Sequence, residues 1–267
     1  MRRTPMLPLP TPRNFLWILC ACALSAGLWA PIHSHAADAI SVATLQQKLQ
    51  APFKPDAPPQ IAITSFRADF DQQAHIASLN RSKDGHGKVS VRFNANAPAA
   101  FRWDYLEPEV QHIISNGKKL WVYLPESNRV MISSIDEHLK DGDDPLLFLR
   151  SLDNLERHFT LSLPEPPRSQ SEDHPGDYLL TLTPKQDSPY MRNLTLHIPA
   201  ALLDTAQPDL FPLAGVTILD PNGNTTVLRF NQVEINTAPA PEEFMFTVPP
   251  GVEIVHPEPA PFEKQLD

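Results

Sequence analysis

The chain has 267 residues, 42% of them hydrophobic and 20% charged, which is enough to bury a substantial core. Its net charge of −9 argues against nucleic acid as a partner, because phosphate backbones are bound by clusters of Lys and Arg. Both cysteines, Cys20 and Cys22, lie near the N-terminus, so the remainder of the chain can form neither a disulfide nor a thiolate metal site.

Residues 1–36 have the layout of a secretory signal peptide. Arginines precede a short apolar run over residues 15–28, and Ser34-His35-Ala36 forms a small-x-small cleavage site. The run is shorter than the roughly 20 residues that span a bilayer. We therefore expect cleavage after Ala36. Removing 36 of 267 residues leaves 231, and it removes three arginines and no acid, so 19 Lys and Arg remain against 31 Asp and Glu, a net charge of −12.

Lipidation at Cys22 is the alternative processing route, because Leu19-Cys20-Ala21-Cys22 faintly resembles a lipoprotein processing box. A lipidated Cys22 would anchor the protein to a membrane. The apolar run continues past this box and a good conventional site follows it, which favours cleavage after Ala36.

A short helix and an extended linker come next. Asp38 is a candidate helix cap, and apolar residues between Ile40 and Leu49 fall on or near one face. Prolines between residues 52 and 59 end this helix. Alternation from Phe66 to Phe70 then predicts the first strand.

The clearest strand signals follow, with apolar side chains alternating at residues 88–93, 101–105, 112–115, 120–124 and 129–132. Asn116-Gly117 between two of these runs is a typical hairpin turn, because both residues tolerate a positive φ. Phe101, Trp103 and Tyr105 are expected to share one face of their strand, as are Trp121 and Tyr123.

The second half of the chain begins with a predicted helix, Pro145 to Leu152, whose acidic cap and N-terminal proline are typical of a helix start. It is apolar nearly all round, so another part of the protein must cover it. Further strands are predicted at residues 159–163, 178–183, 194–198, 216–219 and 225–230. So many strand signals with two helices predict one mainly β domain, a strongly curved antiparallel sheet or incomplete barrel over residues 37–256, followed by a flexible tail at 257–267.

No catalytic or metal-binding motif is present. The histidines stand apart, and the sequence has no Gly-x-Ser-x-Gly elbow, phosphate-binding glycine loop or zinc motif. Asp141, Asp143 and Asp144 could bind calcium, but capping the predicted helix is the better explanation. We predict neither an enzyme nor a cofactor.

Several segments resemble, in the same order, the LolA family of periplasmic carriers of outer-membrane lipoproteins. They are Phe66 and Phe70, Phe101-Arg102-Trp103, residues 115–123, 144–149 and 244–252. The resemblance implies an unclosed antiparallel β-barrel (half-barrel) with short helices as a lid over a hydrophobic cavity. It also implies a monomeric periplasmic chaperone for acylated lipoproteins, with an inner-membrane ATP-driven exporter and an outer-membrane acceptor as partners and no cofactor.

By themselves, the alternating aromatic residues are better explained by an ordinary core. The resemblance implies instead that they line a site for acyl chains, worth about 0.8 kcal/mol per buried CH₂. The lipid-binding candidates are Phe70, Phe101, Trp103, Ile113, Trp121, Tyr123, Leu146, Leu147, Phe148 and Leu149.

One feature departs from the family. Its members typically carry an Arg-Pro pair just before the Phe-x-Trp motif, and that arginine is thought to lock the lid. Here Ala97-Pro98 stands in its place, so either Arg92, five residues upstream, is the lid lock or the closed state is held differently. The same fold also allows an outer-membrane lipoprotein acceptor or a lipid-binding envelope sensor, and a lipidated Cys22 would favour the acceptor.

Overall fold

The computed structural model describes residues 40–94, 97–134, 152–172, 175–188, 191–204 and 210–256. Its strands are β1 (Ser65–Ile76), β2 (Arg81–Asn94), β3 (Ala97–Glu107), β4 (Gln111–Ser115), β5 (Lys119–Leu124), β6 (Arg129–Ser134), β7 (Phe159–Ser162), β8 (Tyr178–Pro184), β9 (Asn193–Ile198), β10 (Gly215–Leu219), β11 (Thr225–Ile235) and β12 (Glu253–Val255). Its helices are α1 (Val42–Gln50) and α4 (Ala201–Asp204), with the short 3-10 turns η1 (Ala51–Phe53), η2 (Ala77–Leu79), η3 (Leu155–Arg157) and η4 (Pro241–Phe244).

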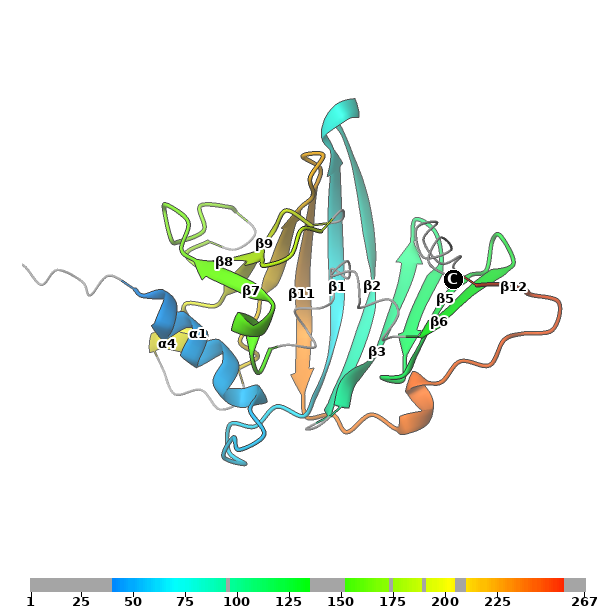
Figure 1. Ribbon diagram of the computed structural model, residues 1–267, viewed down its shortest axis with the longest axis horizontal. Helices are drawn as coiled ribbons and strands as arrows, with labels where there is room; N and C mark the ends of the chain where they lie inside the picture. Colours follow the sequence, from blue (N-terminus) through cyan, green and yellow to red (C-terminus); the bar gives the residue numbers. More distant parts are fainter. Residues whose placement is uncertain are drawn as a thin grey trace, which may run out of the picture. The chain divides into compact units, whose positions relative to one another are not determined.

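All of these strands form one sheet, in the order β12-β6-β5-β4-β3-β2-β1-β11-β10-β9-β8-β7 (Figure 1). Neighbouring strands run antiparallel except β12, which runs parallel to β6. The two ends of the order, β12 and β7, do not pair, so the sheet stays open. The predicted fold class, a mainly β protein built on an unclosed antiparallel sheet with short helices, is confirmed.

The first helix begins one turn later than the sequence suggests. Ser41 is the N-cap, and its side chain accepts a hydrogen bond from the backbone N–H of Thr44 at 3.1 Å. The prediction of Asp38 as the cap was therefore wrong, because the hydroxyl that satisfies the free N–H lies three residues further on. Leu45 and Leu49, one turn apart, are fully buried.

The central strands separate two faces of the sheet. On β1, Phe66, Ala68 and Phe70 are buried, whereas Arg67 and Asp69 between them are not. We call the side that carries Phe66 and Phe70 the inner face, and the side that carries Arg67 and Asp69 the outer face.

The main hydrophobic core lies on the inner face. Helix α1 packs against β8 there, and Leu152 and Leu155 join the same cluster (Figure 1). Aromatic rings pack at its centre, with the centroids of Phe66 and Phe211 4.4 Å apart. The part of the inner face that crosses β7 to β11 is therefore filled by the protein's own side chains.

The hairpin between β4 and β5 has a loop of three residues, not the two that Asn116-Gly117 suggested. Of the two, only Gly117 has a positive φ, at 85°. The Asn116 side chain instead accepts hydrogen bonds from the backbone N–H groups of Lys118 and Lys119, each at 2.9 Å. This Asx turn closes the loop, and beyond it Ser115 pairs with Leu120.

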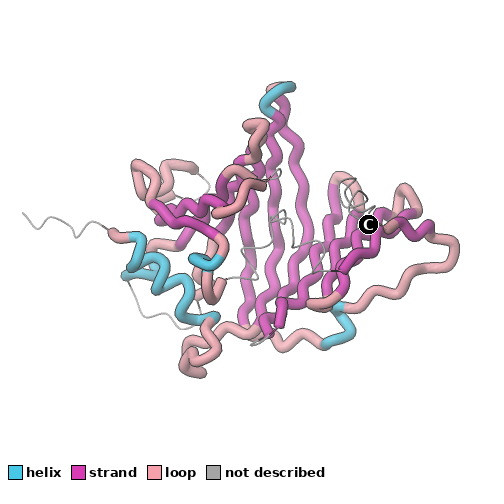
Figure 2. The backbone as a smooth tube through the Cα atoms, viewed as in Figure 1, coloured by secondary structure: helices cyan, strands magenta, loops and turns pink. Residues whose placement is uncertain are grey.

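Several predicted segments lie outside the described residues. These are the signal peptide 1–36, the tail 257–267 and residues 146–149 of the predicted lid helix. Among the helices that the structure does describe, none has both the length and the apolar character to cross a membrane. Figure 2 shows that strands make up most of the described chain, with few and short helical segments.

Candidate functional site

A row of apolar side chains crosses the inner face at right angles to the strands. Trp103 on β3 pairs with Ile113 on β4, which pairs with Val122 on β5, which pairs with Met131 on β6. Exposure rises along this row. Trp103 is 1% exposed, Ile113 and Val122 are half-buried, and Met131 is 39% exposed. The row therefore forms a continuous apolar surface that leads from β6, next to the edge strand β12, into the core.

Aromatic residues surround the buried end of this row. The ring of Phe70 packs edge-on against Trp103, with centroids 4.8 Å apart, and against Tyr105 at 4.9 Å. Phe101, one position along the same face, is 3% exposed. Aromatic pairs in this geometry add stability beyond their buried area, so this end of the row is well ordered.

Tyr105 brings a hydroxyl to the inner face without bringing a charge. Its Oη donates a hydrogen bond to Oε1 of Gln72 at 2.9 Å. Burial raises the pKa of Tyr105 to about 12, because an ionised phenolate would be poorly solvated here. The hydroxyl of Tyr105 therefore adds a hydrogen-bonded but uncharged group to the inner face.

The structure places Trp121 and Tyr123 on the outer face. They belong to a second cluster with Ile114, which faces away from the row. The segment after β11 covers this cluster with Phe246, Val248 and Val252. The predicted lipid-binding set is thus divided between two faces, and only its inner-face members are brought together.

The covering segment, residues 237–252, begins at the end of β11. It runs below the central strands in the view of Figure 2 and leads into β12. We call it the C-terminal strap. Its turn η4 lies against β3 and buries Phe244 completely. An ion pair between Arg67 and Glu243 and a hydrogen bond from Arg102 Nη1 to the backbone oxygen of Glu243, at 3.4 Å, tie the turn to the sheet.

The candidate lid lock, Arg92, also lies at the strap. Its guanidinium is 5.2 Å from the centre of the Phe244 ring, a cation–π arrangement. The lid residues that Arg92 was predicted to hold lie outside the described residues. In the described part of the chain, the contact of Arg92 is therefore with the strap.

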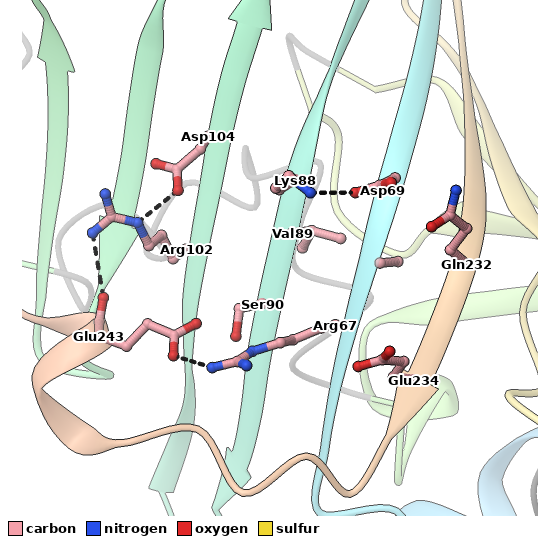
Figure 3. Close-up of a pocket in the computed structure, with 11 residues that line it drawn as sticks. Arg67, Asp69, Lys88, Val89, Ser90, Arg102, Asp104, Gln232, Glu234 and Glu243 are labelled. Atoms are coloured by element: carbon pink, nitrogen blue, oxygen red, sulfur yellow. Dashed lines mark hydrogen bonds and ion pairs between the residues drawn. The ribbon is translucent and has the colours of Figure 1, made fainter.

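Between the strap and β11 the outer face carries a polar pocket of about 430 Å³ (Figure 3). Lys88 Nζ and Asp69 Oδ1 are 3.1 Å apart in its wall. Arg102 Nε donates to Asp104 at 2.7 Å, and His112 Nδ1 is 2.5 Å from the other oxygen of that carboxylate. These charged groups are already paired, and no aromatic residue lines the pocket, so it does not suit an acyl chain.

Metal chemistry finds no support in the described ranges, where no three His, Cys, Asp or Glu side chains gather to hold an ion. The inner face thus carries an apolar surface, and the outer face carries ion pairs and the C-terminal strap.

Comparison with known proteins assigns the family. The family model described as outer membrane lipoprotein carrier protein LolA matches residues 62–247, which is more than half of the chain. The chain belongs to the LolA family. This confirms the resemblance that the sequence motifs indicated.

Among LolA relatives, the outer-membrane lipoprotein carrier protein of Methylobacillus flagellatus is 26% identical over 223 residues, which cover 81% of this chain and 98% of that protein. The carrier protein of Alkalilimnicola ehrlichii is 31% identical over 193 residues, which cover 72% and 78%. A solved LolA superfamily protein from Nitrosomonas europaea matches with a TM-score of 0.41 at 16% identity, covering 78% of this chain and 99% of that one.

The residues predicted from the sequence include Phe70, Phe101, Trp103 and Ile113 of the inner face. The prediction omitted Val122 and Met131, which continue the row beyond Ile113. Both residues lie in segments with alternating side chains, 120–124 and 129–132. In each segment the residues on the opposite face are also apolar, so alternation alone does not tell the two faces apart. The strap was missed as a structural element, although its apolar residues 244–252 were noted.

Proposed function

We propose that this protein is a periplasmic carrier that binds the acyl chains of lipoproteins and passes them from the inner membrane to an outer-membrane acceptor. The observation that carries the proposal is the graded apolar row from Met131 to Trp103 in a member of the LolA family. Met131 is more than one-third exposed, so the outer end of the row is accessible to a ligand.

Binding would be driven by burial of hydrocarbon. Each CH₂ removed from water contributes about 0.8 kcal/mol, so even part of one acyl chain laid along the row gives useful affinity. Phe70, Phe101, Trp103 and Ile113 would contact the chain, and residues 146–149 would close over it as a lid. Trp121 and Tyr123 would instead support the sheet from its outer face.

We propose that transfer runs downhill in free energy. A ligand moves between proteins only when the next binder holds it more strongly. We propose that an inner-membrane ATP-driven exporter loads the carrier and that an outer-membrane acceptor with higher affinity for acyl chains unloads it.

The test is to purify the protein from the periplasm under gentle conditions and to detect bound acylated lipoprotein by native mass spectrometry. Met131→Glu places a charge at the entrance of the row, where partial exposure lets the protein fold, and should abolish the bound species. Met245→Glu makes the same change on the strap, where the side chain is 53% exposed, and should leave binding intact. If the unaltered protein carries no lipoprotein, or if both variants behave alike, the carrier function is wrong.

A further inference from the structure

The hairpin of β1 and β2 extends beyond the strands on either side of it (Figure 1). β2 begins at Arg81, but its first residue that pairs with β3 is His86. The five residues before His86 therefore carry the hairpin roughly 16 Å past the point where β3 stops pairing. On the other side, β11 pairs with β1 only as far as His75. We call the outermost part of this hairpin, residues 77–83, the hairpin tip.

The hairpin tip presents a leucine to solvent on a hydrogen-bonded support. Asn80 has a positive φ of 47°, and its N–H donates to the backbone oxygen of Ala77 at 3.3 Å. The N–H of Ala77 in turn donates to Oδ1 of Asn224, on the turn between β10 and β11, at 3.0 Å. Leu79 is 61% exposed, the highest value among the large apolar side chains of the described residues. The backbone of the tip is thus held in place while this side chain stays in water.

The charges closest to Leu79 along the hairpin are positive. Residues 72–83 contain no Asp or Glu but include Arg81 and Lys83, which are both exposed. Their partners on β1 lie an even number of positions from Phe70, so both cations belong to the inner face. Within the described ranges, neither of them takes part in an ion pair. An exposed apolar side chain and two free cations therefore occur together at the tip.

The acids of this region are turned away or occupied. Asp84 belongs to the outer face, where its carboxylate accepts a hydrogen bond from the side chain of Gln73 at 3.1 Å. Asp220, on the turn that supports the tip, accepts hydrogen bonds from the backbone N–H groups of Asn222 and Asn224, each at 2.8 Å. The inner side of the hairpin tip is therefore a positive patch on a chain whose net charge is −9.

We propose that the hairpin tip is a contact surface for an anionic phospholipid bilayer. Leu79 enters the interface between headgroups and acyl chains, and Arg81 and Lys83 meet the headgroup phosphates. Because both cations lie on the inner face, docking turns that face, and with it the apolar row, toward the membrane. This inference extends the proposed carrier function by assigning where the protein touches a membrane, but the contact itself needs no bound lipoprotein.

A projection of this kind lets an acidic protein approach an anionic surface. Charges are screened over about 8 Å at physiological ionic strength. The tip extends about twice that distance beyond the pairing with β3, so most of the acidic body stays out of range when the tip touches a bilayer. Each cation near an anionic surface strengthens partitioning about fivefold, and insertion of the leucine strengthens it about tenfold. The contact is therefore weak and reversible, as a carrier that must leave the membrane requires.

The test is co-flotation of the protein purified from the periplasm with vesicles. One set contains equal parts of phosphatidylglycerol and phosphatidylcholine, and the other contains phosphatidylcholine alone. We expect partitioning to the anionic vesicles to be about 25-fold stronger than to the neutral ones, and to weaken as salt is raised. Arg81→Gln combined with Lys83→Gln should lower partitioning to the anionic vesicles about 25-fold. Leu79→Ser should lower it about tenfold.

Matched control variants lie at the opposite end of the strands. Lys118→Gln combined with Lys119→Gln removes the same charge from exposed positions of the hairpin between β4 and β5. Met245→Ser removes an apolar side chain that is 53% exposed on the C-terminal strap. Both controls should change partitioning by less than about twofold, because these sites stay beyond the screening length from the bilayer. All of the altered side chains are exposed, so the variants should fold like the unaltered protein.

Equal partitioning of the unaltered protein to the two kinds of vesicle would overturn the inference, and so would its failure to bind either kind. An equal loss in the tip variants and in the controls would overturn it as well. The vesicles contain no lipoprotein, so any of these results leaves the carrier function standing. Absence of lipoprotein from the purified protein would conversely refute the carrier function without affecting the result with vesicles.

Discussion

Trp103 and Trp121 point to opposite faces of the sheet because they pair with consecutive residues of β4. Trp103 pairs with Ile113 and Trp121 with Ile114. Adjacent residues of a strand face opposite sides, so the first indole lies in the inner core and the second beneath the C-terminal strap. The two tryptophans therefore report separately on the inner core and on strap docking.

Removing the side chain of Phe244 should destabilise the protein by about 3–5 kcal/mol, because the ring is fully buried and also stacks on Arg92. Urea unfolding of Phe244→Ala measures this cost. Met245→Ala is the matched control, since its side chain is 53% exposed, and should change stability by less than about 0.5 kcal/mol. Equal effects of the two substitutions would mean that the strap does not anchor through Phe244.

Gly117→Ala should be costly for two reasons. Its φ of +85° is unfavourable for any residue with a side chain, and an added Cβ would lie 2.7 Å from the backbone oxygen of Pro98. We expect a loss of about 3 kcal/mol in unfolding free energy. Gly251→Ala has a similar φ of +82° with nothing within 4 Å, so it should lose only about 1 kcal/mol. A cost at Gly251 as large as that at Gly117 would contradict the predicted clash.

Stability should fall at alkaline pH through Tyr105. Burial raises the pKa of this phenol from 10.0 to about 12, so folding favours the protonated form. The contribution is fully present below pH 10 and is lost as pH rises toward 12, with a total of up to about 3 kcal/mol. Chemical unfolding measured between about pH 9 and 12 checks this. The free energy of unfolding should fall more steeply with pH for the unaltered protein than for Tyr105→Phe. Parallel curves would exclude Tyr105 as the source.

The mature N-terminus should be Ala37 with a free amine. Mass spectrometry of the protein from periplasm checks this directly. A diacylglyceryl group on Cys22 would instead indicate an anchored protein and would favour the outer-membrane acceptor over the carrier.

Periodicity was sufficient to locate β1 to β11, but not the three-residue strand β12. The alternation at Phe66 to Phe70 and at Phe101 to Tyr105 matches β1 and β3. Large apolar side chains at every second position lie on one face only in a strand, so this pattern predicts a strand. The open sheet and the family follow from these runs and their order.

Periodicity could not show which faces of different strands coincide. Phe101 and Trp121 each begin an alternating pair, but Trp103 pairs with Ile113 whereas Trp121 pairs with the next residue, Ile114, so the two pairs lie on opposite faces. The candidate site was therefore only half assembled from sequence. The cap at Ser41 was missed for a similar reason, since Asp38 and Ser41 are equally good capping residues one turn apart.

The pairing of β12 with β6 has a consequence for how the protein behaves at high concentration. An exposed edge strand is a template for adding strands from other molecules, and here the edge beside the half-open apolar row is occupied by three residues of the same chain, held by the Arg129–Glu253 ion pair at 2.8 Å. At the opposite end, β7 is only four residues long. Short edge strands leave few free backbone N–H and C=O groups, so this protein can expose an apolar surface without adding strands from other molecules into a fibril.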